Sequence, residues 1–276
     1  MLKQLKEIQL LKKEMEKDSK RKPKKKKIGR AIKSIEYIKN KDKIGAEKWT
    51  DQRKKNIGNF PSPSRIVLLG PCGKGKTTLI KNLIMHQRPK FDEVFLVHED
   101  AEFTKEYQDM DLTDQFDEIP NLEFWETDGR KIKRAIIIDD LELTSAHKER
   151  KKNLAILFRY ASSHKFLTVY FSHQSFFDIP NLIKKMSNIY IIWEPRARNE
   201  LSMIENRIGL PKESLKKLFK TVAINHRDSI CIDMTENSPC KLRLNIWKKI
   251  KIDESESDED EDDDEDEDDS DEENDN

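Results

Sequence analysis

A glycine-rich segment, GPCGKGKTT at residues 70–78, constrains the fold of this chain more than any other feature. An apolar run at 65–69 precedes the segment, and a helix-competent stretch at 77–85 follows it. The residues that match the phosphate-loop pattern GxxxxGK[ST] without a mismatch are Gly70, Gly75, Lys76 and Thr77. A strand, a glycine-rich loop and a helix in this order predict a phosphate-binding turn at the edge of an α/β sheet.

The chemistry of such a loop explains its residue types. Glycines let the chain wrap so that backbone N–H groups point at phosphate oxygens. Lys76 is expected to reach the β- and γ-phosphates, and the Thr77 hydroxyl to ligate Mg²⁺. The residues expected to contact the nucleotide are Gly70, Pro71, Cys72, Gly73, Lys74, Gly75, Lys76, Thr77 and Thr78. The loop therefore predicts binding of a nucleoside triphosphate, with ATP and Mg²⁺ as cofactors.

The core of the chain alternates apolar strands with helical stretches. Strands are predicted at 65–69, 93–97, 122–125, 135–138, 166–171 and 188–193, and helices at 77–86, 148–163, 196–207 and 212–219. Several strands are continuously apolar, as expected of parallel strands buried on both faces. We expect an α/β fold, a three-layer P-loop NTPase domain with a mainly parallel sheet. Further β-rich segments at 222–225, 229–234 and 242–247 predict antiparallel strands at one edge.

Charge divides the chain into three parts, with predicted boundaries at 1–60, 61–252 and 253–276. The 53 basic and 53 acidic residues cancel overall, but 19 of the acidic residues lie in 253–276, which has no basic residue. The preceding 252 residues carry a net charge of +19, and +13 of that surplus lies in 1–60. The chain is therefore a basic protein with an acidic tail, although its total charge is neutral. We predict that both charged ends of the chain are disordered.

The basic end contains two distinct segments. Apolar residues at steps of three and four predict an amphipathic helix at 1–18, either solvated or used for docking or oligomerisation. The run KRKPKKKKIGR at 20–30 is compatible with nucleic-acid contact, nuclear import or plain solubility. The acidic tail either solubilises the chain or competes with DNA for its basic surface, and Ser255, Ser257 and Ser270 resemble acidophilic-kinase sites.

Cysteine and hydropathy patterns bear on the compartment. Cys72, Cys231 and Cys240 are too scattered for a disulfide framework or a zinc site, which favours a reducing environment. No apolar run approaches the length that spans a bilayer, and the N-terminus lacks a secretory core. The expectation is an intracellular protein without a membrane span.

The second half of a nucleotide-hydrolysing site is predicted at KRAIIIDD, residues 133–140. Asp139 would hold Mg²⁺ through water at the end of an apolar strand, and Asp140 would act as general base toward the attacking water. Glu142 is close enough to compete for that role. The next strand, FLTVYF, ends in SHQSF, where Gln174 could orient the water or sense the γ-phosphate. Ser172 and His173 are alternatives to Gln174.

The order of these motifs resembles that of the poxvirus-type genome-packaging ATPases, the viral branch of the FtsK/HerA superfamily found also in giant viruses, virophages and Maverick/Polinton elements. The resemblance covers residues 65–207 and rests on GPCGKGKTT, FDEVFLVHED, AIIIDDLE, LFRYASSHKFLTVYFSHQSFFDIP and MSNIYIIW. It implies a ring-forming homo-oligomer that uses ATP to translocate double-stranded DNA into a capsid. It also implies capsid or portal-vertex partners and a location at the viral assembly site, in host cytoplasm or nucleus, or in the virion.

One departure from that family concerns an arginine. The family's Gly-Arg-His triplet, whose arginine is a candidate finger toward the neighbouring subunit's phosphate, is replaced here by Ser162, Ser163 and His164. Arg159, one helical turn upstream, is the candidate for a finger acting in trans, ahead of Arg196 and Arg198. Such a residue contributes about 10³–10⁵-fold to turnover in other NTPases.

Two other functions use the same loop. A small-molecule kinase would need an acceptor pocket and an arginine-rich lid, whereas Gln174 and the paired aspartates favour water as the acceptor. A non-enzymatic nucleic-acid-binding protein would only hold the nucleotide. Phosphate release stimulated by long double-stranded DNA separates both from a motor.

Overall fold

The computed structural model describes residues 58–100, 105–126, 132–143, 147–236, 238 and 240–250. The predictions for the amphipathic segment, the basic run and the acidic tail fall outside these residues and remain predictions.

The described residues form an α/β domain around one nine-stranded sheet, in the order β3-β2-β4-β5-β1-β6-β7-β8-β9. The first six strands in this order are parallel, and β7, β8 and β9 add to β6 antiparallel. The strands are β1 (Arg65–Leu69), β2 (Glu93–Val97), β3 (Asp114–Phe116), β4 (Arg134–Asp139), β5 (Leu167–His173), β6 (Ile189–Trp193), β7 (Ser229–Asp233), β8 (Leu242–Leu244) and β9 (Lys248–Lys249).

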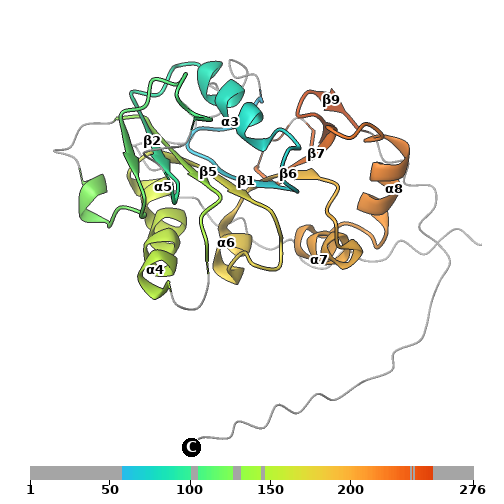
Figure 1. Cartoon of the computed structure of the whole chain (residues 1–276). Helices are drawn as coiled ribbons and strands as arrows, with labels where there is room; N and C mark the ends of the chain where they lie inside the picture. The colour runs from blue at the N-terminus through green and yellow to red at the C-terminus, as the bar shows by residue number, and fades with distance from the viewer. Residues whose placement is uncertain are drawn as a thin grey trace, which may run out of the picture. The chain divides into compact units, whose positions relative to one another are not determined.

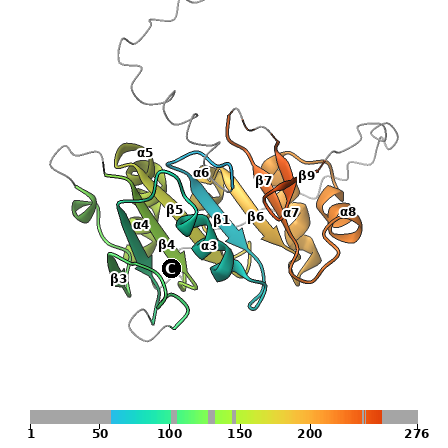
Figure 2. The ribbon, with the colours of Figure 1, turned by 90° about the horizontal axis from the view of Figure 1, so that it is seen from above.

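Helices cover both faces of this sheet. In Figure 1, α3 lies on one side of the sheet, and α4, α6 and α7 lie on the other. Figure 2 shows the strands side by side from above, with α3 over the middle of the sheet. The helices are α3 (Lys76–Met85), α4 (Lys148–Ile156), α5 (Ser162–His164), α6 (Asn181–Met186), α7 (Arg198–Ile208) and α8 (Ser214–Thr221), with a 3₁₀ turn η2 (Glu123–Trp125) and a π-helical turn η3 (Leu157–Ala161).

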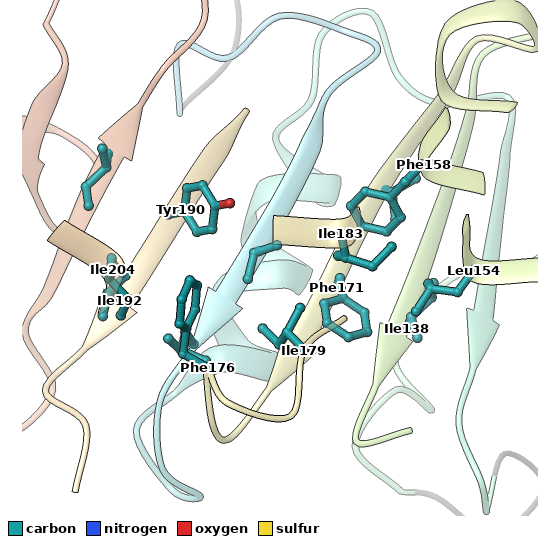
Figure 3. Close-up of a cluster of buried hydrophobic side chains, with 14 of the residues drawn as sticks. Ile138, Leu154, Phe158, Phe171, Phe176, Ile179, Ile183, Tyr190, Ile192 and Ile204 are labelled. Carbon is teal, nitrogen blue, oxygen red and sulfur yellow. The ribbon is translucent and has the colours of Figure 1, made fainter. Parts of the chain in front are cut away.

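Two apolar layers hold the helices to the sheet. On the α3 side, Ile80 packs with strand residues such as Leu68 and Ile137. On the other side, Phe158 and Phe171 meet edge to face, with ring centroids 6.2 Å apart. Figure 3 shows this second cluster, to which α4, η3, α6 and α7 all contribute. Fully burying each such side chain stabilises the fold by roughly 1.5–3 kcal/mol.

The predicted fold class, a three-layer P-loop NTPase domain with a mainly parallel sheet and antiparallel edge strands, is confirmed. The strands at 65–69 and 93–97 have the predicted bounds. The helix predicted at 148–163 is a run of three elements, α4, η3 and α5, because a π-helical turn interrupts it.

Two predicted strands are wrong. Residues 122–125 hold the turn η2, because Asn121 Oδ1 accepts from the Phe124 N–H at 3.2 Å and the aromatic rings pack edge-on against Phe95. The edge position belongs instead to β3, which sequence reasoning missed. Residues 222–225 form no strand but connect α8 to a tight turn. In this turn the Asn225 N–H donates to Asp228 Oδ2 at 3.0 Å, and the Asp228 N–H donates to the Asn225 carbonyl at 2.9 Å.

Candidate nucleotide-binding and hydrolysis site

The phosphate loop follows β1 directly and ends where α3 begins. Gly75 precedes the helix with φ 98°, in the left-handed region that favours glycine. Gly70 lies so close to β6 that an added Cβ would stand 2.7 Å from Trp193 Cβ. The loop therefore needs glycine at one position for backbone conformation and at the other for close approach.

The ammonium group of Lys76 lies inside the curve of this loop. Its Nζ donates to the carbonyl oxygens of Gly70 at 2.7 Å and Pro71 at 3.2 Å, and the side chain is buried. Buried charge is costly unless it is compensated, and these carbonyls compensate it. Phosphate oxygens would offer the same ammonium a stronger, charge-assisted partner.

Thr77 and Asp139 meet at the other side of the loop. The Thr77 hydroxyl lies 3.1 Å from Asp139 Oδ2 and also 3.1 Å from Glu106 Oε2. A single hydroxyl has one proton, so it donates to one of these carboxylates at a time. Three oxygen-bearing side chains thus surround one point beside the loop.

Tyr107 holds Asp139 from the opposite direction. Its hydroxyl donates to Asp139 Oδ2 at 2.6 Å, and the ring is buried. Burial raises the pKa of Tyr107, and the neighbouring Asp139 carboxylate raises it further, so the phenol keeps its proton and remains a donor. Sequence reasoning missed Glu106 and Tyr107, because they belong to an irregular segment between β2 and β3.

Asp140 and Gln174 come from the ends of adjacent strands. Strand β5 lies between β1 and β4, and Asp139 pairs with Ser172 across β4 and β5. The Gln174 amide donates to Asp140 Oδ1 at 3.4 Å, and both side chains are exposed. Asp140 has φ 47°, which turns the chain sharply after the buried Asp139.

The competing residues lie elsewhere or are engaged. Asp140 lines the pocket beside the phosphate loop, and Glu142 does not. Ser172 is fully buried in β5 beside Leu68 of β1, and His173 contacts the backbone of Ser175 at 3.0 Å through Nδ1. Burial lowers the pKa of His173, although the Ser175 carbonyl and two nearby aspartates oppose the shift, so the neutral ring is favoured.

The candidate arginines occupy two different edges of the sheet. Arg159 is exposed in η3, next to Phe158, whose carbonyl accepts from Arg65 at the start of β1 at 3.1 Å. This is the amino edge of the strands, roughly 16 Å from the phosphate loop by the length of β1. Arg196 is exposed at the carboxyl edge, between β6 and α7, and Arg198 is the first residue of α7.

A pocket of about 780 Å³ lies beside the phosphate loop, and neither Gln174 nor the three candidate arginines line it. Its lining includes Cys72 and the residues from Gly73 to Thr78, together with Asp139 and Asp140. Its volume is in the range of pockets that hold small molecules such as nucleotides.

Among the described residues no cluster of three His, Cys, Asp or Glu side chains could hold a metal. In the same part of the chain, no helix is long and apolar enough to cross a membrane.

Comparison with known proteins gives structural similarity alone. Neither family models nor curated proteins match this chain. B204, the DNA-packaging ATPase from Sulfolobus turreted icosahedral virus, is 16% identical with a TM-score of 0.49, over 69% of this chain and 99% of that one. B204 from Sulfolobus turreted icosahedral virus 2, in complex with ATP-gammaS, is 18% identical with a TM-score of 0.48, over 68% and 98%.

A third similar structure is the cytoplasmic domain of the type VII secretion ATPase EccC from Thermomonospora curvata. It is 13% identical with a TM-score of 0.45, over 67% of this chain and 28% of that one. The class of this domain follows from its own strand order and phosphate loop, which together form a P-loop NTPase fold.

Proposed function

We propose that this chain is an ATP-hydrolysing motor that packages viral double-stranded DNA into a capsid. The observation that carries hydrolysis is the 3.4 Å contact between the Gln174 amide and Asp140. Asp140 lines the phosphate-loop pocket, and Gln174 contacts it from the end of β5, the strand that lies between β1 and β4. Water, rather than a second organic substrate, is the acceptor that this pair suits.

In the proposed mechanism each side chain acts on a stated atom. Lys76 Nζ exchanges its loop carbonyl partners for oxygens of the β- and γ-phosphates and offsets their negative charge. An Asp140 carboxylate oxygen accepts a proton from the attacking water, and the Gln174 amide orients that water in line with the γ-phosphate. Hydrolysis yields ADP and phosphate.

The residues beside the loop fit Mg²⁺. Magnesium prefers oxygen ligands and is usually held by one or two carboxylates together with substrate phosphates and water. Thr77 Oγ1 and Asp139 Oδ2, 3.1 Å apart, provide this donor set, with Glu106 as a further carboxylate within reach. When bound, the ion would neutralise charge that develops on the transferred phosphoryl group. Tyr107 keeps the Asp139 carboxylate in place for it.

The DNA part of the proposal rests on charge and on the family resemblance. Residues 1–252 carry a net charge of +19, and lysine-rich segments bind the phosphate backbone by releasing counterions. The motif order from 65 to 207 resembles that of the genome-packaging ATPases. The proposed partners are therefore double-stranded DNA and capsid or portal-vertex proteins, and the proposed location is the viral assembly site.

A ring is proposed because of where Arg159 lies. At the amino edge of the sheet it cannot reach the phosphate loop of its own chain, which begins at the carboxyl edge. In a head-to-tail ring the amino edge of one subunit can face the site of the next. Arg159 would then stabilise charge on the neighbour's γ-phosphate.

One assay separates this function from its rivals. Phosphate release from ATP should rise when long double-stranded DNA is added, and the rise should diminish steeply with salt. A small-molecule kinase would show slow hydrolysis that DNA does not change. A non-enzymatic nucleic-acid-binding protein would bind ATP and DNA without releasing phosphate. Either of these results would refute the motor.

A further inference from the structure

The pocket beside the phosphate loop extends well beyond the residues that phosphate would contact. One wall is the loop and the first turns of α3, including Thr78 and Asn82. The opposite wall comes from the antiparallel edge of the sheet and includes Asp228, Asn245 and Trp247. A triphosphate held by the loop would fill only one end of this pocket of about 780 Å³, which leaves the second wall for the rest of the ligand.

The second wall is fastened to the phosphate loop. Lys74 Nζ donates to the His226 carbonyl at 3.0 Å, and Trp193 Nε1 donates to the Arg227 carbonyl at 3.0 Å. The turn at 225–228 is thereby held to the loop from one side and to β6 from the other. The wall is positioned before any ligand arrives, which lowers the entropic cost of binding.

Within that wall the turn between β8 and β9 is tied to the turn at 225–228. Asn245 Nδ2 donates to Asp228 Oδ1 at 2.8 Å, while Asn245 Oδ1 accepts from the Ser229 N–H at 2.8 Å. Both functional groups of the Asn245 amide are thus engaged in holding the two turns together. The residues that follow Asn245 therefore have a fixed place beside the pocket.

This turn has an unusual backbone. Asn245 has φ 50° and Ile246 has φ 66°, and a β-branched residue in the left-handed region is strained. The conformation buries Ile246 in the core, where its carbonyl accepts from Arg243 at 3.1 Å. The next residue, Trp247, is left 56% exposed although it lines the pocket. In this turn Ile246 belongs to the core, and Trp247 stays at the pocket wall.

We propose that Trp247 is the base platform of the site, on which the base of the bound nucleoside triphosphate stacks. The inference rests on the proposed function, since it requires nucleotide at the phosphate loop. An indole offers a flat π-face that pairs with any nucleobase, and burial beneath a base removes an exposed apolar surface from water. Trp247 is thus the specificity element that distinguishes a nucleotide from a bare polyphosphate.

The test compares two ligands on the full chain. The affinities of Mg²⁺–ATP and of Mg²⁺–tripolyphosphate, which has no base, are measured by calorimetry for wild type, Trp247→Ala and Trp247→Phe. Trp247→Ala should weaken ATP binding about 5- to 150-fold, the range of base–aromatic stacking, and leave tripolyphosphate binding unchanged. Trp247→Phe, which keeps an aromatic ring, should retain most of the wild-type ATP affinity. Met234→Ala is the matched control, because Met234 is an exposed apolar residue just after the end of β7. It should leave the affinity for both ligands unchanged.

Two results would overturn the inference. One is Trp247→Ala binding ATP as tightly as wild type. The other is Trp247→Ala losing affinity for tripolyphosphate to the same extent as for ATP, which would mean that the ring only supports the fold of the wall. A wild-type protein that binds neither ligand would instead refute the proposed function itself.

Discussion

The Tyr107 hydroxyl donates to Asp139 Oδ2 at 2.6 Å and so joins an irregular segment after β2 to the end of β4. The same oxygen of Asp139 faces the Thr77 hydroxyl at 3.1 Å. The carboxylate that is proposed to hold Mg²⁺ is therefore oriented from two directions by side chains far apart in the sequence.

Replacing Tyr107 by Phe removes that hydroxyl while keeping the buried ring. Since hydrogen bonds to a metal-binding carboxylate typically account for 10–100-fold in metal affinity or activity, Tyr107→Phe should raise the Mg²⁺ concentration for half-maximal ATP hydrolysis by at least about tenfold. Tyr160→Phe, at an exposed tyrosine in η3, is the control and should not shift it. An unchanged Mg²⁺ requirement in Tyr107→Phe would show that this contact does not position Asp139.

The contact between Gln174 and Asp140 predicts a separate effect on chemistry. Asp140→Asn should lower the ATP turnover about 10²–10⁴-fold, as loss of a general base does, with little change in ATP affinity. Gln174→Ala should also lower the ATP turnover, and raising the pH should not bring this variant back to the wild-type rate. Glu142→Gln is the matched control, since Glu142 is an exposed carboxylate outside the pocket lining. If Glu142→Gln loses turnover and Asp140→Asn retains it, the two carboxylates have been assigned in the wrong order.

The strongly periodic and strongly patterned parts of the chain were predictable from the sequence. The strand at 65–69 and the phosphate loop after it follow from apolar runs and glycine spacing, and Asp139 ends its strand as the IIIDD pattern indicates. The prediction that Gln174 would lie beside the phosphate required its strand to neighbour the one at 135–138. The pairing of β4 with β5 meets that condition.

What the sequence did not reveal depends on tertiary contacts. Tyr107 reaches Asp139 from a segment with no periodic pattern, so nothing local signals its role. The strand predicted at 122–125 is a turn because the rings of Phe124 and Trp125 pack edge-on against Phe95, and this packing rather than strand pairing buries Trp125. The sequence predicts a strand over 242–247, but β8 ends at Leu244, and Trp247 lies in a turn whose left-handed backbone at 245 and 246 is held by hydrogen bonds across two turns.

Burial of His173 predicts a pH dependence of stability. Its pKa in the folded chain lies below the ordinary value of about 6.5, so the unfolded chain binds a proton more readily than the folded chain does. The free energy of unfolding should therefore fall as pH decreases through about 6.5, and continue to fall until the pH passes below the lowered pKa of the folded chain. His173→Gln should flatten this part of the profile, whereas His86→Gln, at an exposed position, should not. Parallel profiles for wild type and His173→Gln in thermal unfolding would contradict the assignment.

The position of Arg159 predicts that subunits inhibit one another when mixed. Arg159→Ala should keep ATP binding but lose hydrolysis, because the missing guanidinium belongs to the neighbour's site. Titrating it into wild type at constant total protein should lower activity more steeply than dilution alone. Lys152→Ala, an exposed cation on α4, is the control. Activity that falls only in proportion to the wild-type fraction would remove Arg159 from the mechanism and reopen Arg196 and Arg198.

Hydrolysis at the phosphate loop is tested most directly by phosphate release from Lys76→Ala at saturating ATP, with and without long double-stranded DNA. Lys76 is the buried cation at the centre of the loop, and Lys90→Ala, an exposed lysine beyond α3, serves as its control. Lys76→Ala should keep a wild-type melting temperature and release no phosphate above background, while Lys90→Ala should behave as wild type. Substantial turnover by a folded Lys76→Ala protein would contradict the assignment of this loop as the site of hydrolysis.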